Sequence, residues 1–283
     1  MNMITRFAPS PTGLLHLGHA WSALQTSEAA RREGGQFLLR MEDIDTERCK
    51  LEFDAAILED MAWLGLDWDG PIRRQSDHFD AYAGVLKHLE AAGLVYPCFC
   101  TRKQIRAEVR AAGSAPHGPL GLIYPGTCRA LSHGERSERI DADENHAWRL
   151  DWAEAARRTG PLFWNDQTRG TIAADPAIAG DVVLARKDTP ASYHVAVTHD
   201  DHLQGVTFVT RGVDLFEATH LHRLLQAVMG WNVPEYHHHG LLAGPDGKRF
   251  AKRDKAMTLA SMREAGMNPE DVMAMAQELA EAS

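Results

Sequence analysis

The sequence predicts an α/β fold whose main body is a doubly wound parallel sheet, and three observations support this prediction. The chain opens with a strand, a turn, a helix and a second strand, the order in which such sheets begin. Of its 283 residues 44% are apolar and 24% are charged, which is ordinary for a globular protein with a sizeable core. Between residues 97 and 135 cysteine, proline, glycine and histidine become frequent and the helical periodicity fades, which indicates an inserted, loop-rich module.

The first half of the predicted sheet is assigned to residues 1–96. Short apolar runs bounded by proline or glycine indicate its strands, and apolar residues three or four positions apart indicate its helices. Glycine ends the helices, as Gly93 does for the last of them. The expected elements are strands at 3–7 and 37–41 and helices at 18–33, 52–64 and 79–92.

The rest of the chain is assigned to three further regions. They are an inserted α+β module with a metal site at 97–180, the second half of the sheet at 181–240, and a basic loop with a short helical segment at 241–283. Within the module, short strand-like pieces carry tryptophans 148, 152 and 164. Beyond it, the expected elements are strands at 181–184, 206–209 and 240–242, a helix at 215–229 and helical structure over about the last 25 residues.

Composition and charge exclude several classes of protein. The net charge of −9 argues against a protein that coats nucleic acid non-specifically. The chain has no apolar run of about 18 residues that could span a membrane, and residues 1–6 lack the pattern of an export signal. We therefore expect a cytoplasmic protein. Four cysteines in a chain of this length do not suggest a disulfide framework.

The loop after the first strand has the features of a phosphate-binding site. Residues 6–13 (Arg-Phe-Ala-Pro-Ser-Pro-Thr-Gly) lead into His16-Leu17-Gly18-His19, which opens a helix. A helix N-terminus presents unpaired N–H groups and the positive end of the helix dipole, both of which favour phosphate. Gly18 allows close approach of a nucleotide, and His16 and His19 can donate hydrogen bonds to it. A tight turn with two surface histidines would explain the short histidine motif equally well.

The lead-in and the histidine motif together resemble the first signature of class I aminoacyl-tRNA synthetases, in their glutamyl and glutaminyl branch. The resemblance runs from Arg6 to about Leu259, and it implies a class I Rossmann-type catalytic core that uses ATP with Mg²⁺. The basic loop at 248–255 resembles the second signature, in which Lys252 would contact the ATP phosphates. This loop has Arg249 where the family usually has lysine and Ala251 where it usually has serine. A solvated basic loop is the alternative interpretation.

The expected amino-acid pocket combines arginines with a carboxylate. Glu42 follows the second strand and suits the ammonium group of an amino acid, and arginines such as Arg6 and Arg211 can bind carboxylates bidentately. Each residue alone could equally form a surface ion pair, or a buried side chain in the case of Tyr193. The resemblance implies that the residues binding glutamate are Arg6, Phe7, Ala8, Pro9, Ser10, Glu42, Tyr193 and Arg211. It likewise implies ATP binding by His16, Gly18, His19, Arg249 and Lys252, with His16, His19 and Lys252 acting in catalysis.

Three cysteines, Cys98, Cys100 and Cys128, suggest a metal site in the inserted module. Zinc prefers four thiolate or imidazole ligands, so the spacing leaves His117, His133 and Tyr124 as candidates for the fourth, and reduced free thiols as the alternative. Cys49 lies far away and is expected to be a buried apolar residue. The arrangement resembles the zinc site of short members of the same family, which implies one structural Zn²⁺ held by Cys98, Cys100, Tyr124 and Cys128. The run at 237–239 is not expected to bind metal, because consecutive histidines on an extended segment point to alternate faces.

The expected reaction follows from this resemblance. Members of the full-length family continue into a helical anticodon-binding domain, whereas about 25 residues remain here after the match, so no such domain is expected. The short members activate glutamate with ATP and transfer it to the queuosine base in the anticodon loop of tRNA(Asp). Basic residues at 102, 103 and 106 could contact that tRNA or simply form a solvated helix face. The alternatives are charging of a tRNA 3′ end, transfer to a small amine or thiol, and a non-catalytic binding module. Neither a membrane nor a stable protein partner is implied.

Overall fold

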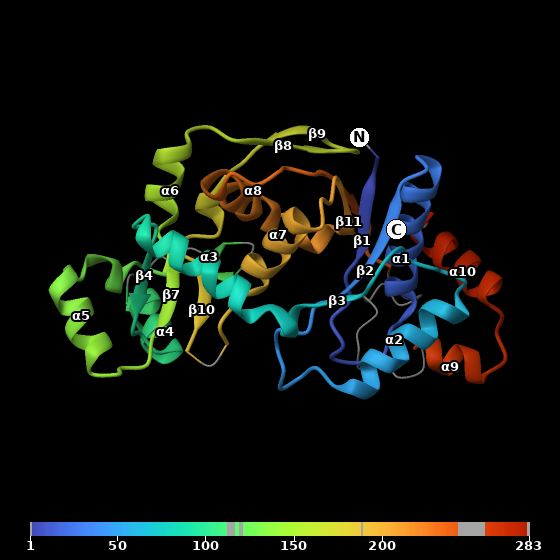
Figure 1. Ribbon diagram of the computed structural model, residues 1–283, viewed down its shortest axis with the longest axis horizontal. Helices are drawn as coiled ribbons and strands as arrows, with labels where there is room; N and C mark the ends of the chain where they lie inside the picture. Colours follow the sequence, from blue (N-terminus) through green and yellow to red (C-terminus); the bar gives the residue numbers. More distant parts are fainter. Residues whose placement is uncertain (1, 112–116, 119–120, 188, 243–257, 282–283) are drawn as a thin grey trace.

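The computed structural model describes residues 2–111, 117–118, 121–187, 189–242 and 258–281. Its main sheet consists of two hydrogen-bonded groups of strands that meet edge to edge (Figure 1). In the first group β1 (Ile4–Phe7), β2 (Gln36–Met41) and β3 (Arg73–Arg74) are parallel. In the second, β11 (Phe208–Gly212), β12 (Glu235–His239) and β8 (Phe163–Asp166) are parallel and β9 (Gly170–Ala173) is antiparallel. The prediction of an α/β fold with a parallel sheet is confirmed.

The two groups join at their first strands. The carbonyl oxygen of Ile4 accepts a hydrogen bond from the backbone N–H of Thr207 at 3.0 Å, and the N–H of Ile4 donates to Thr207 Oγ1 at 2.9 Å. Strand β1 therefore lies in the middle of the sheet, between β2 and the segment that leads into β11. Because the joined segments are 203 residues apart, the centre of the sheet is built from both ends of the chain.

Helices connect and cover the strands. Around the first group lie α1 (Leu17–Arg32), α2 (Leu51–Trp63) and the C-terminal pair α9 (Leu259–Glu264) and α10 (Pro269–Glu281). The centre of the molecule holds α3 (Phe79–Ala91), α7 (Tyr193–Leu203) and α8 (Ala218–Met229). None of the helices in the described part of the chain combines the length and apolar character that a membrane span requires.

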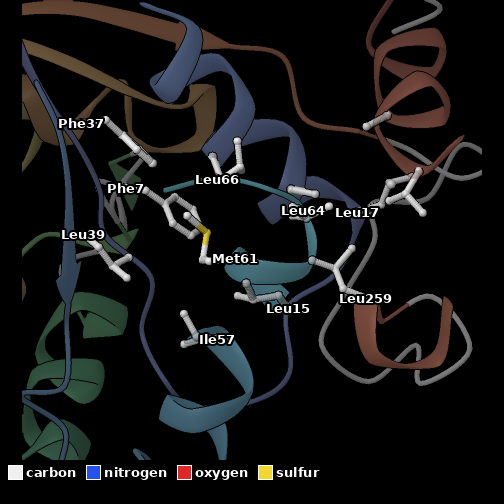
Figure 2. Packing of buried hydrophobic residues seen from close by; sticks show 14 of the residues in the cluster. Phe7, Leu15, Leu17, Phe37, Leu39, Ile57, Met61, Leu64, Leu66 and Leu259 are labelled. Carbon is white, nitrogen blue, oxygen red and sulfur yellow. The ribbon is translucent and has the colours of Figure 1, made fainter. Parts of the chain in front are cut away.

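A core cluster ties the C-terminal helices to the N-terminal strands (Figure 2). Phe7 and Leu39 from the sheet pack with Met61 of α2, Leu17 of α1 and Leu259 of α9, all of them at most 5% exposed. Burial of an aliphatic side chain of this size stabilises a fold by about 1.5–3 kcal/mol. A backbone hydrogen bond from Leu259 N to the Leu15 carbonyl, 2.9 Å long, adds to this attachment. The start of α9 is thereby fixed beside the loop that opens α1.

The inserted region contains more regular structure than we predicted. An antiparallel sheet of β4 (Val95–Cys98), β7 (Ala147–Leu150) and β10 (Val183–Arg186) forms its centre, and three helices surround it. The prediction of loop-rich structure at 97–135 was wrong for the helix at Arg102–Ala111, because that helix is mostly charged and its two large apolar residues, Ile105 and Val109, are too few to show a clear periodicity. The predicted boundaries at 96 and 180 stay predictions; β4 lies across the first of them, and β10 begins three residues after the second. The other elements here are α4 (Arg102–Ala111), α5 (His133–Asp141), α6 (Trp152–Thr159) and the small hairpin of β5 (His117–Gly118) and β6 (Gly121–Leu122).

Three predicted strands lie elsewhere than expected, and one helix outside the inserted region was missed. The strand expected at 181–184 is β10 at 183–186, and it pairs with β7 of the antiparallel sheet instead of joining the main sheet. The strand expected at 206–209 is β11 at 208–212, because Gly205 and Val206 still belong to the turn after α7. The strand expected at 240–242 is β12 at 235–239, so the histidine run itself forms the strand. Helix α7 was missed because the β-branched residues Val195, Val197 and Thr198 do not favour a helix on propensity alone. Among the described residues, four short 3₁₀ turns lie at 75–78, 127–130, 176–178 and 213–215.

Candidate active site

A cavity of about 480 Å³ lies where the carboxyl ends of β1, β2, β11 and β12 face the N-terminus of α1. In open α/β sheets this edge is where ligands bind. Every predicted glutamate-binding residue lines this cavity, and so does every predicted ATP-binding residue that the structure describes. They come from five separate segments of the chain. The lining residues are Arg6, Phe7, Ala8, Pro9, Ser10, His16, Gly18, His19, Trp21, Ser22, Glu42, Tyr193, Thr210, Arg211, Gly212, Asp214, Leu215, His239, Gly240, Leu241 and Leu242.

The two histidines at the start of α1 also cap the helix. His16 is the N-cap residue, and its Nδ1 accepts a hydrogen bond from the Gly18 N–H at 3.1 Å. Nδ1 of His19 accepts one from the His16 N–H, also at 3.1 Å. Because both Nδ1 atoms are acceptors, the neutral form of each ring carries its proton on Nε2. The helix start therefore presents imidazole N–H groups and the positive end of its dipole to the same cavity.

An ionic network fixes the side of the cavity that β1 and β2 build. Arg6 binds Asp201 of α7 through Nε and Nη2, at 2.9 and 3.4 Å, and Arg40 Nη2 donates to the same carboxylate at 2.8 Å. Arg40 also contacts Glu42 at 3.4 Å and the side chain of Gln204 at 3.0 Å. All of the charged side chains in this network are less than 10% exposed. The charge of Arg6 is therefore compensated by a carboxylate.

Burial and neighbouring charges set the protonation of this network. Burial alone would raise the pKa of Asp201, but the guanidinium groups of Arg6 and Arg40 lower it below its ordinary value. Burial raises the pKa of Glu42 above its ordinary value, and the charges of Arg40 and Arg6 act against this shift. Burial also raises the pKa of Tyr193 to about 12, so its phenol stays protonated at neutral pH. Glu42 is the acidic group through which this side of the cavity can bind a cationic ligand group.

On the opposite side of the cavity, the groups that contact Arg211 are neutral. Its Nε donates to His238 Nε2 at 3.1 Å, and its Nη2 donates to Thr219 Oγ1 at 2.6 Å. Its Nη1 lies 3.3 Å from His222 Nδ1 and 3.4 Å from the Tyr193 hydroxyl. Arg211 is 5% exposed, and within the described ranges it forms no ion pair with a carboxylate. His222 and Thr219 were not predicted to lie at the site; their only signal is their spacing on one face of α8.

Three histidines near Arg211 stay neutral near pH 7: His194, His222 and His238. Burial, followed by the charge of Arg211, lowers the pKa of His194 and that of His238 to about 4. Burial lowers the pKa of His222 well below its ordinary value, and again Arg211 is the next largest cause. A buried positive charge surrounded by neutral acceptors favours an anionic ligand, because that ligand would be its first counter-ion.

A second cavity, of about 320 Å³, shares part of its wall with the first. Ser10, Glu42 and Tyr193 line both. Arg48 and Arg186 add positive charge to the second cavity, and Asp45 adds negative charge. Cys49, which we expected to be buried, is only half-buried and lines this second cavity, because it follows a turn on the surface rather than lying in the core.

The three predicted thiols come together in the inserted module. The sulfur atoms of Cys98, Cys100 and Cys128 all lie within 4.8 Å of one another and could hold a metal ion. The Tyr124 hydroxyl lies 3.5 Å from Cys100 Sγ and accepts a hydrogen bond from Cys128 N at 2.8 Å. Zn–S bonds of about 2.3 Å in a tetrahedron separate sulfur atoms by about 3.7 Å, so small side-chain movements would fit this set to zinc. His133 lies exposed at the start of α5, and the side chain of His117 lies outside the described residues.

The other predictions concern the basic loop, the histidine run and the basic helix. Arg249, Ala251 and Lys252 lie outside the described residues. The residues on either side of that segment are described: Leu242 lines the first cavity, and Thr258 pairs with His16. In the histidine run, His238 bonds to Asp166 and His239 to the Gly240 carbonyl, so the three rings do not converge. The basic side chains at 102, 103 and 106 are exposed on α4.

Comparisons with known proteins identify the family of this chain. Residues 2–280 match the family of class I tRNA synthetases (E and Q), catalytic domain. A glutamyl-Q tRNA(Asp) synthetase of Rhodobacter capsulatus is 47% identical over 275 residues, which cover 95% of this chain and 98% of that protein. A glutamate–tRNA ligase of Nitratidesulfovibrio vulgaris is 39% identical over 272 residues, which cover 95% of this chain and 55% of the ligase. The crystal structure of a glutamate tRNA ligase from Elizabethkingia meningosepticum in complex with its amino acid has a TM-score of 0.76 and 32% identity. The match covers 90% of this chain and 52% of that ligase, so this chain spans about half of its length.

Proposed function

Because this chain belongs to the family of class I tRNA synthetase (E and Q) catalytic domains, we propose that it activates glutamate with ATP and transfers it to the queuosine base of tRNA(Asp). The acceptor is proposed from the name of the relative that matches over nearly the full length of both chains. The resemblance of the cysteine and tyrosine spacing to that of the short family members points to the same acceptor. Since tRNA is a cytoplasmic partner, the proposal places the enzyme in the cytoplasm.

One observation in the cavity carries the choice of an amino acid as substrate, and the family supports glutamate in particular. Arg211 is a buried cation in the cavity wall with only neutral partners in the described part of the chain, so a substrate carboxylate would complete it. Glu42 lies in the same wall and suits the ammonium group of that substrate. A pocket with these two groups favours a ligand that carries negative charge as well as an ammonium group.

Activation would take place next to the start of α1. A glutamate carboxylate oxygen attacks the α-phosphorus of ATP, the bond to the β-phosphate oxygen breaks, and glutamyl-adenylate and pyrophosphate result. His16 and His19, with protons on Nε2, would donate to the phosphate oxygens as charge moves onto pyrophosphate. Lys252 belongs to the segment between Leu242 and Thr258, both at this site, and would add positive charge. Mg²⁺ bound with ATP would neutralise part of the phosphate charge.

Transfer would use the second cavity. A hydroxyl of the queuosine cyclopentene diol attacks the activated carbonyl carbon and an ester forms. AMP leaves with the bonding electron pair, and its phosphate takes up the proton of the hydroxyl. Because Ser10, Glu42 and Tyr193 line both cavities, a group in the second one would lie against a substrate bound in the first. Arg48 and Arg186 at the second cavity suit the phosphates of an RNA loop.

The acceptor is tested with labelled glutamate and three RNAs. These are queuosine-containing tRNA(Asp) without its 3′-terminal adenosine, the same tRNA without queuosine, and intact tRNA(Glu). The first has no 3′ end that can be charged, so incorporation into it alone is the expected result. Incorporation only into tRNA(Glu) would identify a minimal enzyme that charges a 3′ end. Glutamate-dependent ATP–pyrophosphate exchange, measured in parallel, separates activation from transfer.

We further propose that Cys98, Cys100, Tyr124 and Cys128 hold one structural zinc ion. The donor set of three sulfurs and one phenol oxygen within a small volume supports this proposal. Metal analysis should find one zinc per chain, and Cys98→Ser should release it and destabilise the inserted module, seen as faster proteolysis there. Cys49→Ser is the matched control and should keep the zinc. Stoichiometric zinc in the Cys98→Ser protein would contradict this assignment.

A further inference from the structure

We propose that two buried pairs, Asp166–His238 and His194–His222, hold Arg211 in place by neutral acceptors and so keep its charge available for a substrate carboxylate. These are positioning residues, and they reach the substrate only through Arg211. The inference rests on the proposed glutamate site and adds to it the residues that make Arg211 a receptor. None of these residues was predicted from the sequence to act at the site.

The first pair follows from the direction of its hydrogen bonds. A guanidinium group only donates, so His238 Nε2, 3.1 Å from Arg211 Nε, must be an acceptor without a proton. The proton of this ring then sits on Nδ1, which donates to Asp166 Oδ2 at 2.7 Å. Asp166 Oδ1 is held in turn by the hydroxyl of Thr168 at 2.7 Å and the N–H of Arg169 at 3.2 Å. Asp166 therefore sets the tautomer of the ring that holds Arg211.

The second pair repeats this arrangement on the other side of the guanidinium. His222 Nδ1 accepts from Arg211 Nη1, so its Nε2 carries the proton and donates to His194 Nδ1 at 3.1 Å. His222 and His238 are 3% and 5% exposed, and Asp166 is 2% exposed. The buried carboxylate of Asp166 thus reaches Arg211 only through an imidazole ring, whereas Asp201 binds Arg6 directly.

The tautomer is tested with Asp166→Asn, a change of one atom. The amide can turn its oxygen to Thr168 and its NH₂ group to His238 Nδ1, which forces the ring proton onto Nε2. That proton would then point at Arg211 Nε–H, and the hydrogen bond would be lost. We expect the KM for glutamate in ATP–pyrophosphate exchange to rise about 10-fold or more, with a much smaller change in kcat and in the KM for ATP. Asp181→Asn, the same change at a buried carboxylate that accepts a hydrogen bond from Tyr96, is the matched control and should leave the glutamate KM unchanged.

The uncompensated charge is tested with two substitutions of His222 that differ in charge. His222→Gln offers a neutral acceptor, and His222→Glu offers a carboxylate that would pair with Arg211. Calorimetric titration with glutamate should give a Kd at least about 10-fold weaker in His222→Glu than in His222→Gln. Melting temperatures should show both proteins folded, with His222→Glu no less stable than His222→Gln, because the new pair satisfies the buried cation.

The outcomes separate this inference from the proposed function. A wild-type protein that binds glutamate but catalyses no exchange would overturn the proposed function alone. Equal glutamate affinities in His222→Gln and His222→Glu would overturn the inference alone. An unchanged glutamate KM in Asp166→Asn would have the same meaning, and this second variant decides the matter if His222→Glu does not fold.

Discussion

The two sides of the central cavity hold their arginines by different means. On the side built by β1 and β2, Arg6 and Arg40 share the carboxylate of Asp201, so both charges have a counter-ion without a ligand. On the side built by β11, β12 and α8, Arg211 has histidines, a threonine and a tyrosine as partners. A compensated arginine contributes to the fold, whereas an uncompensated one lowers stability until an anion arrives. This difference distinguishes the side of the pocket around Arg6, which stabilises the fold, from the side around Arg211, which we propose to bind the substrate.

The strongest test of this difference is Arg211→Ala. Removing the uncompensated cation should lower kcat/KM for glutamate by roughly 1,000-fold or more, equivalent to about 4 kcal/mol, as expected for loss of a buried charge partner. Stability to urea should change little or rise, because the fold loses a buried charge without a counter-ion. Exchange assays and urea unfolding measure the two effects. Exchange that persists unchanged would show that Arg211 does not bind the substrate.

The complementary test is Asp201→Ala on the other side. This change leaves Arg6 and Arg40 buried together without their shared carboxylate, which should cost about 3–4 kcal/mol of unfolding free energy. Urea unfolding of the folded fraction measures it. If Arg211→Ala proves to be the more destabilising of the two changes, the contrast between the two sides is wrong.

As the pH falls, protonation should destabilise the Arg211 side of the cavity before it destabilises the Asp201 side. The histidine pKa is about 6.5 in the unfolded chain but about 4 for His194 and His238 in the fold. The unfolded chain therefore takes up more protons, and stability is lost as the pH falls from about 6.5 to about 4. The largest loss of unfolding free energy that His238 can contribute over this pH range is on the order of 3 kcal/mol. The pKa of Asp201 is lowered below its ordinary value, so protonation of Asp201 should reduce stability only at lower pH.

This pH dependence can be measured by urea unfolding at pH 7, 5.5 and 4.5. The variant His222→Gln lacks one of the buried histidines and should show a smaller loss over the same range. An equal slope in this variant would mean that the acid sensitivity arises elsewhere in the molecule.

The smallest effect is expected at an exposed ion pair that touches neither side. Arg32 and Glu28 lie one turn apart near the end of α1, with their side chains 70% and 42% exposed. Glu28→Gln should change the unfolding free energy by less than about 0.5 kcal/mol, because water screens such pairs. Exchange activity should be unaltered. A larger effect would show that the exposure of an ion pair does not predict its contribution to the unfolding free energy of this protein.

Local signals in the sequence predicted much of the fold and many of the residues that line the cavity. The first strand, α1 and the second strand could be read from apolar spacing and from glycines, and the pocket residues followed from a family resemblance. Arg6, Glu42, Tyr193 and Arg211 do line one cavity. Their roles in binding stay predictions. The segment with Lys252 could be named but lies outside the described residues.

What the sequence could not show is how distant residues pair. Asp201 meets Arg6 across 195 positions, and Asp166 meets His238 across 72, so no short-range pattern connects them. Helix α7 was missed for a related reason. Its β-branched residues favour a strand locally, and the packing of buried residues such as Val195 and Ala196 into the core decides otherwise.

The junction of β1 with the segment before β11 also has a consequence for the way the protein is made. A ribosome adds about 5–20 residues per second, so Thr207 and Asp201 leave it roughly 10–40 s after their partners Ile4 and Arg6. During that interval the first strand has an open edge, and Arg6 lacks its carboxylate. The cavity is therefore among the last features to form, and a nascent chain that stops short of residue 201 cannot complete it.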